Sequence, residues 1–307
     1  MLEYNSKIYL FAPIINANTE LIRANKFLQV EINSLHQRLG EKMLQDLYGR
    51  DRFYEFGVQL FNNEENFFYI LYEINLPEVS VSNLDFPIGS ELWPEKYLQQ
   101  TNEKIENLNF RILILNTFSN GNIQIPEYNL VIKRSIDQKF KSVATLGGQS
   151  IGKIGPKFEI ENWNNIYSLT EQKLKSIPDY IKLALKHLEK SFNRDDYFSF
   201  LSILIGFEVI FNNGKDQIRY TISRNVAVMI GNSIEVSKEI FKKMKSAYDI
   251  RSSLVHNGKY NETELEDYLP LLESYLKKSL RLLLINKFSK DELIEKLTLL
   301  GFGNPLT

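Results

Sequence analysis

Arg251 and His256 are the two residues of this sequence whose types and spacing most suggest chemistry. They lie near the end of a long helical pattern that starts near Ile234, and Asn257-Gly258, a common helix-ending pair, follows them. RNA can be cut without a metal when a base removes the 2′-hydroxyl proton and an acid protonates the leaving 5′-oxygen. An imidazole suits both tasks because its pKa lies near neutrality, and a guanidinium matches the oxygens of the scissile phosphate. The pair is therefore a candidate ribonuclease site.

The position of Arg251 within the helical pattern is unusual. At about 100° per residue it falls in the middle of an apolar sector. That sector consists of Val236, Ile240, Met244, Ala247 and Leu254. A guanidinium cannot lose its charge on burial, so this position needs a partner or an anionic ligand. His256 lies about 140° away around the helix, and we expect the fraying helix end to bend it away from that ideal direction. The alternative is a satisfied interhelical arginine and a helix-capping histidine.

This arrangement resembles the HEPN superfamily, and its Apea-like branch is closest. The Apea-like motif reads much like Tyr-Asp-Arg-Ser-x-x-x-His-Gly, and two upstream segments agree with it: residues 205–208, which end in an acid, and residues 220–227. The resemblance spans about residues 178–285 and leaves the N-terminal half uncovered. It implies an all-α HEPN-type bundle and a metal-independent ribonuclease without a cofactor, in which Arg251 and His256 form the active site.

Three neighbours of this pair are candidates for supporting roles. Ser252 stands where many relatives carry Asn, Asp or His. Its hydroxyl can hydrogen-bond a phosphate oxygen but transfers protons poorly, which leaves open whether a second group in each chain shares the chemistry. For Asn257 we favour a structural capping role. Tyr248 is either a core residue or a residue that lines the site.

Glu208 is a further supporting candidate because it lies in an almost wholly apolar helical pattern. A buried carboxylate is costly unless it is paired. The sequence offers Arg219, Arg224 and Arg251 as partners. The resemblance places an acid near the site here, and structural pairing is the reading that we favour.

A lysine face leads to the candidate site. Lys238, Lys242 and Lys245 lie three and four residues apart and share a face of the helical pattern with His256. Such a face is either solvated surface or a surface that holds RNA phosphates. We take Lys242, Lys245 and the following Lys259 as candidate RNA-binding residues.

A glycine-rich stretch at residues 147–156 raises another hypothesis, that of a metal-dependent nuclease or nucleotide hydrolase. Gly147 and Gly152-Lys153 approach the spacing of a phosphate-binding loop, but Ile154 follows where Ser or Thr would ligate magnesium. Pro156 then blocks the helix whose N-terminus should meet the phosphates. We therefore interpret this stretch as a linker and expect no metal site. His36 and His187, which lack metal-ligand neighbours, are expected to be surface residues.

Composition fits an ordinary globular protein. The chain has 307 residues, 43% of them hydrophobic and 24% charged, with a net charge of −1 and no cysteine. It is long enough for two domains. The near-zero charge excludes a global basic field, so any nucleic-acid contact must come from a local patch. The absence of cysteine excludes disulfides and thiolate metal sites. The first residues lack a basic segment and no apolar run reaches about 20 residues, so we expect a soluble cytoplasmic protein without a membrane span.

The pattern of the chain changes near residue 160, which predicts an α+β protein. Residues 1–160 mix strand and helix signals and form a predicted mixed α/β domain. Its strands are expected at residues 7–14, 27–32, 66–74, 110–118 and 122–133, and its helices at residues 35–48 and 94–107. Residues 119–122 form a hairpin turn and residues 76–93 a loop. Residues 161–307 are nearly all helical, with helices near residues 178–192, 195–211, 217–230, 234–256 and 262–288 and a capped one from Ser289.

These observations favour an endoribonuclease that cuts RNA through its 2′-hydroxyl. By resemblance, we expect a toxin or an anti-phage defence effector with an antitoxin or another defence protein as partner. The first domain has no recognisable catalytic cluster, and we expect it to sense, target or regulate. Cleavage requires a base and an acid, but one chain offers only one suitable histidine. Two copies of the chain would supply two, so we expect a homodimer through the helical domain. The alternative is a non-catalytic HEPN module that binds RNA, a nucleotide or a partner protein.

Overall fold

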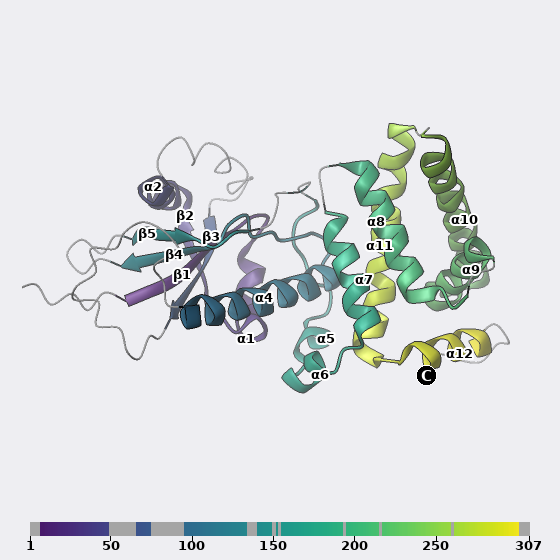
Figure 1. Ribbon diagram of the computed structural model, residues 1–307, viewed down its shortest axis with the longest axis horizontal. Helices are drawn as coiled ribbons and strands as arrows, with labels where there is room; N and C mark the ends of the chain where they lie inside the picture. The colour runs from purple at the N-terminus through teal and green to yellow at the C-terminus, as the bar shows by residue number, and fades with distance from the viewer. Residues whose placement is uncertain are drawn as a thin grey trace, which may run out of the picture. The chain divides into compact units, whose positions relative to one another are not determined.

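The computed structural model is α+β and divides into two compact units, Met1–Glu161 and Asn162–Thr307 (Figure 1). It describes residues 7–48, 66–74, 95–133, 140–148, 152, 155–192, 195–214, 217–258 and 261–300. The loop predicted at residues 76–93 and the candidate Lys259 lie outside these residues. The predicted fold class, a sheet-containing first half followed by helices, is confirmed.

A five-stranded antiparallel sheet forms the centre of the first unit. Its strand order is β2-β3-β1-β4-β5. The strands are β1 (Lys7–Ile14), β2 (Ile32–His36), β3 (Asn66–Ile74), β4 (Asn129–Lys133) and β5 (Phe140–Thr145). In the middle strand, Leu10 is paired with Tyr72 of β3 on one side and with Leu130 of β4 on the other. Because successive side chains alternate, Leu10 and Phe11 lie on opposite faces of this sheet.

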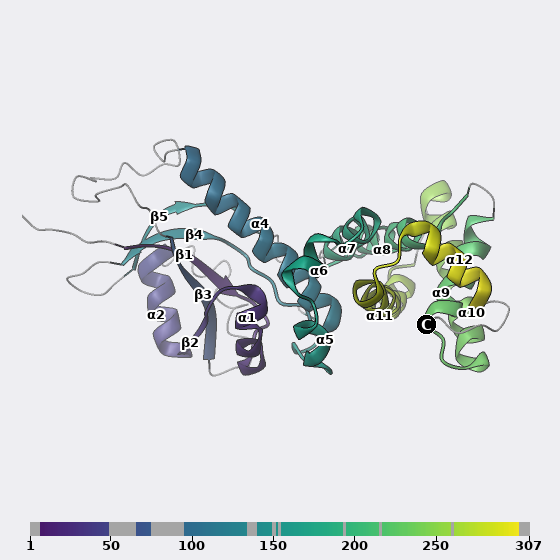
Figure 2. The ribbon, with the colours of Figure 1, turned by 90° about the horizontal axis from the view of Figure 1, so that it is seen from below.

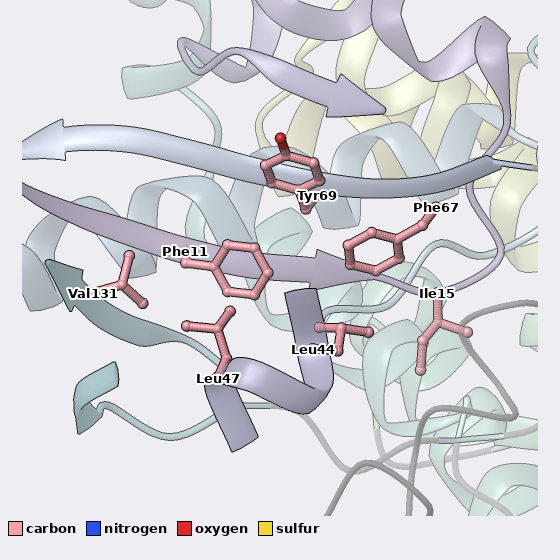
Figure 3. Close-up of a cluster of buried hydrophobic side chains, with 7 residues drawn as sticks. All are labelled: Phe11, Ile15, Leu44, Leu47, Phe67, Tyr69 and Val131. Carbon is pink, nitrogen blue, oxygen red and sulfur yellow. The ribbon is translucent and has the colours of Figure 1, made fainter. Parts of the chain in front are cut away.

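Each face of the sheet carries a helix. Helix α2 (Gln37–Tyr48) covers the Phe11 face, where its Leu44 and Leu47 pack against aromatic side chains of β1 and β3 (Figure 3). Phe11 and Tyr69 lie there with ring centroids 5.5 Å apart. Helix α4 (Glu95–Phe118) lies on the other side of the sheet (Figure 2). Burial of such side chains, at about 1.5–3 kcal/mol each, holds these layers together.

Gly40 explains how α2 can lie so close to the sheet. A Cβ atom at this position would lie 2.7 Å from Cβ of Phe67, which is shorter than real contacts allow. The missing side chain therefore sets the distance between this helix and β3.

Several local predictions for the first unit were wrong. Residues 110–118 form the last turns of α4 rather than a strand, because every residue from Arg111 to Ser119 is buried and the run shows no helical periodicity in its sequence. The turn predicted at residues 119–122 therefore follows the end of α4, and it does not connect two strands of a hairpin. Residues 27 and 28 end the short helix α1 (Asn25–Leu28), which follows a 3-10 helix (Thr19–Ala24). A turn comes next, and the strand starts only at Ile32.

The second unit consists of helices. They are α5 (Trp163–Tyr167), α6 (Glu171–Lys175), α7 (Asp179–Lys190), α8 (Asp196–Phe211), α9 (Ile218–Ile230), α10 (Ile234–Asn257), α11 (Glu262–Asn286) and α12 (Lys290–Leu300). Helix α8 packs against α7, α9 and α11, as its nearly continuous apolar sequence predicted. The side chain of Asp195 caps it by accepting a hydrogen bond from the Phe198 amide, and Ser289 and Glu292 form the predicted capping box of α12.

Candidate functional site

Helix α10 carries most of the candidate residues. The Ser233 hydroxyl caps its start by accepting a hydrogen bond from the Val236 amide at 3.2 Å. At its end Gly258 adopts φ 61°, and its amide donates to the Leu254 carbonyl at 3.2 Å. Glycine adopts this left-handed conformation more easily than other residues do, which explains why the helix ends at Gly258. The helix is regular through Asn257, and the predicted fraying at His256 is wrong.

Arg251 forms an ion pair across two helices. One terminal nitrogen, Nη2, lies 3.3 Å from Oε1 of Glu208 on α8. Their side chains are 33% and 24% exposed, so both are largely but not wholly removed from water. Of the three arginines that the sequence allowed as partners, the structure pairs Glu208 with Arg251. A third of the guanidinium side chain remains accessible, and its fork can still receive an anionic ligand.

The remaining atoms around this pair are incompletely satisfied. Nε of Arg251 and the hydroxyl of Tyr248 are buried, and neither has a hydrogen-bond partner among the described residues. Burial, with the negative charge of Glu208 as a second cause, raises the pKa of Tyr248 well above its usual value, against the opposing effect of Arg251. Tyr248 therefore stays protonated. Buried polar atoms without partners are uncommon in folded proteins and mark this cluster as more than a packing contact.

His256 and Ser252 lie on a different side of α10. Both are exposed, and neither side chain makes a hydrogen bond or an ion pair with another described residue. In a regular helix the five-residue offset from Arg251 to His256 corresponds to about 140° of rotation and about 7.5 Å of rise. The structure therefore brings Arg251, Glu208 and Tyr248 together, and it leaves His256 apart from them within one chain.

The capping role that we favoured for Asn257 is wrong. This residue is exposed, and its side chain makes no hydrogen bond in the described part of the chain. The cap is formed by the backbone of Gly258, whose amide reaches back into the last turn.

The lysine face of α10 makes contacts that the sequence did not reveal. Lys238 and Lys242 are exposed, and Lys245 lies with Nζ 5.4 Å from the ring centroid of Phe241. Asp249 would oppose these charges, but it forms an ion pair with Arg219 of α9 at 2.5 Å. Because that carboxylate is paired with Arg219, it is less available to neutralise the lysines nearest to His256.

His187 is half-buried, and not the exposed surface residue that the sequence suggested. Its Nδ1 is buried and has no hydrogen-bond partner among the described residues, and its Cβ lies beside Gly206 of α8. A Cβ at Gly206 would lie 3.5 Å from Cβ of His187. Burial, and then the charge of Lys190, lowers the pKa of His187. His36, in contrast, is exposed at the end of β2.

The described parts of the glycine-rich stretch belong to the first unit. The Gly147 carbonyl accepts the Tyr128 amide at 2.7 Å, and the Gly152 amide donates to the Gln124 side chain at 2.8 Å. A Cβ on Gly148 would lie 1.9 Å from the Pro126 carbonyl oxygen. Gly148 therefore permits close packing, whereas Gly147 has a positive φ of 89° and open space around it. The next helix starts only at Trp163. Lys153 and Ile154 lie outside the described residues.

An open groove of about 610 Å³ lies between α9 and the first half of α10. Sequence reasoning missed it, although residues 220–227 carry a part of the resemblance. The sequence of α9 gives no clear signal for it, because Arg224 is one of two arginines there and is flanked by Ser223 and Asn225. Its neighbours in the groove come from a separate stretch, and only the packing of the two helices reveals them.

Comparisons of the chain with protein-family models, curated proteins and solved structures gave no match. The resemblance to HEPN domains therefore rests on the residues of α8, α9 and α10 themselves. Among the residues that the structure describes, no three acidic or histidine side chains gather where they could hold a metal ion. No helix within those ranges is both long enough and apolar enough to cross a membrane.

Proposed function

We propose that the second unit is an RNA endonuclease of the HEPN type, with Arg251 and His256 as its catalytic residues. The observation that carries the proposal is Arg251 itself, which is anchored by Glu208 and still a third exposed. This exposure leaves the guanidinium accessible to a phosphate. The end of α10 adds an accessible imidazole five residues later.

The reaction that these groups suit is attack by the 2′-hydroxyl of RNA on the adjacent phosphorus. A base takes the 2′ proton, the new O2′–P bond forms, and the P–O5′ bond breaks as an acid supplies a proton to the 5′-oxygen. The products are a 2′,3′-cyclic phosphate and a 5′-hydroxyl. Arg251 would bind the scissile phosphate and stabilise the charge that develops on it, while His256 transfers the protons.

We further propose that the active form is a homodimer through the helical unit. A single imidazole cannot easily lie on both sides of the phosphorus in one step. His187 lies on α7 with its Nδ1 buried and its Cβ beside α8, and His36 belongs to the sheet of the first unit. Two copies of α10 related by a twofold axis would supply both histidines and both arginines to one cleft. The separation of Arg251 and His256 around the helix supports this arrangement.

The biological setting follows from the resemblance alone. We propose that the protein is a cytoplasmic toxin or anti-phage effector whose RNA cleavage arrests growth, with an antitoxin or another defence protein as partner. Its expression should then harm cells, and His256→Ala should relieve the harm. Equal harmlessness of both chains, when both are folded, would count against this setting.

A second function, a non-catalytic module that binds RNA, a nucleotide or a partner protein, is favoured by two observations. Ser252 is a poor proton-transfer group, and Arg251 already has a carboxylate partner, as an interhelical structural arginine would. Purified full-length protein with single-stranded RNA in EDTA separates the two functions. The nuclease cuts RNA in the chelator, spares DNA of the same sequence and loses activity in Arg251→Lys, whereas the binding module cuts nothing.

A further inference from the structure

The groove between α9 and α10 is built from cationic, aromatic and small residues. It is lined on the α9 side by Tyr220, Arg224 and Val228 and on the α10 side by Ser237, Lys238 and Phe241. No carboxylate is among the described residues that line it. The groove is therefore positive as well as partly apolar, a combination that suits an anion carrying an aromatic ring.

Arg224 has a charge that the described residues do not compensate. Its Nη1 donates to two neutral acceptors, the Asn225 side-chain oxygen at 3.0 Å and the Leu297 carbonyl at 3.4 Å. It forms no ion pair within the described ranges, and its Nε and Nη2 make no hydrogen bond there. A half-buried guanidinium that is held in place by neutral groups, with two donors left over, is suited to bind a phosphate.

Tyr220 supplies an accessible ring beside this cation, one helical turn before Arg224. Its side chain is 51% exposed although it packs edge-on against Phe241, with ring centroids 5.6 Å apart and planes at 81°. Phe241 is in turn approached by the Lys245 ammonium at 5.4 Å. The face of Tyr220 is therefore the surface on which a base can stack.

Gly231 fixes the shape of the groove at its closed end. A Cβ atom there would lie 2.1 Å from Oγ of Ser237 and 2.5 Å from the Ala227 carbonyl oxygen. Only a residue without a side chain allows α10 to return so closely along α9. The groove is thus a built feature of the turn between the two helices.

One side of α10 leads from the groove, whose lining ends at Phe241, toward the proposed active site. Phe241, Lys245 and His256 lie on one side of α10, and the rise from Phe241 to His256 is about 22 Å. At about 3.4 Å per stacked nucleotide this is a span of roughly seven nucleotides, and fewer in an extended strand. The lysines between the two places would follow the phosphates of one strand.

We propose that this groove binds one nucleotide of single-stranded RNA at a distance from the cleavage point. The base stacks on Tyr220, and its phosphate is bound by Arg224 and Lys238. This inference rests on the proposed function, because the RNA strand bound here is the substrate of the proposed nuclease. The charge of the lining favours a nucleic acid over a second copy of this chain, because the same groove on a partner would repel it.

Binding of a labelled, fully 2′-O-methylated RNA of twelve nucleotides to the full-length protein tests the proposal without any need for cleavage. Tyr220→Ala should weaken binding about tenfold or more, as expected for loss of one stacked base. Tyr220→Phe, which keeps the ring, should bind like wild type. Arg224→Gln should weaken binding and reduce the slope of log affinity against log salt by about 0.7. The matched control is Phe198→Ala, an aromatic at the start of α8 that is 58% exposed, which should bind like wild type.

Several results would overturn the proposal. One is unchanged RNA affinity in both Tyr220→Ala and Arg224→Gln. Another is a changed oligomeric state in Tyr220→Ala with RNA affinity intact, which would make the groove a protein interface. A third is displacement of the strand by free AMP at concentrations near the affinity of the RNA, which would make it a mononucleotide site. If the variants lose RNA binding but the wild-type protein cuts no RNA, the groove is an RNA-binding site and the nuclease function is refuted.

Discussion

Glu208 of α8 and Arg251 of α10 lie with Oε1 and Nη2 3.3 Å apart, so the arginine of the candidate motif is oriented by a neighbouring helix. Glu208→Gln removes the charge of this anchor and keeps its shape. We expect a loss of about 1 kcal/mol in the free energy of unfolding, since the pair is only partly buried. RNA cleavage should fall by roughly tenfold in kcat, because Arg251 is no longer held toward the phosphate. Denaturant unfolding and single-turnover cleavage measure the two effects.

The control for this variant is Glu273→Gln. It disrupts the ion pair of Glu273 with the buried Lys277 on α11, where the nitrogen and oxygen lie 2.8 Å apart. That change should cost at least as much stability and leave cleavage unaffected at a permissive temperature. If both variants lose cleavage in proportion to their loss of stability, the Glu208–Arg251 pair has only a structural role.

Tyr248→Phe should leave stability unchanged or slightly higher. The hydroxyl that it removes is buried and has no hydrogen-bond partner among the described residues, so no bond is lost with it. Cleavage should nevertheless fall several-fold if this hydroxyl donates to the bound substrate beside Arg251. A variant that is less stable and fully active would show that Tyr248 is a core residue.

The same variant has a defined effect at alkaline pH. The folded-state pKa of Tyr248 is raised, so above the usual value of 10.0 the unfolded chain loses this proton while the folded chain keeps it. The unfolded state then binds fewer protons, and the free energy of unfolding falls as pH rises above 10, by at most about 1.4 kcal/mol per pH unit for this residue. Unfolding curves at pH 9 and at pH 10.5–11 should therefore show a steeper decline for wild type than for Tyr248→Phe. Parallel curves would contradict the assigned burial.

The sequence predicted that Arg251 needs a charged partner, because this arginine falls in an apolar sector of its helix. It did not predict which of three arginines pairs with Glu208, because that depends on how the helices pack. The helix at residues 110–118 was missed for a related reason, since a segment buried on every side has no periodicity. The partial burial of His187 was missed because its sequence neighbours are lysines, while its Cβ lies beside Gly206 of another helix. The groove beside Arg224 combines two helices and had no signature in either alone.

Gly258→Ala tests how the end of α10 is positioned. The residue has φ 61°, where a side chain costs about 1–2 kcal/mol, and we expect a stability loss of about 1 kcal/mol. Cleavage should fall as well, because His256 lies in the last turn. Gly214→Ala is the matched control, since a Cβ there meets nothing within 4 Å and its φ is not positive. A silent Gly258→Ala would show that the cap does not hold the histidine in place.

Mixing of subunits tests the proposed dimer. Arg251→Ala and His256→Ala proteins should each be inactive, and a refolded mixture should regain measurable cleavage because each contributes the residue that the other lacks. Light scattering of dilute active protein gives the mass directly. A monomer with full activity would refute the dimer and require a second proton-transfer group within one chain.

The most direct test of the central claim is the chemistry of the cut ends. Full-length protein is incubated in EDTA with single-stranded RNA and with its 2′-O-methylated copy, and the products are identified by mass. We predict 2′,3′-cyclic phosphate and 5′-hydroxyl ends from the RNA alone, and no cleavage by His256→Ala, whereas the control His36→Ala is fully active. Cleavage of the methylated strand, products with 5′-phosphates, or a fully active His256→Ala would contradict it.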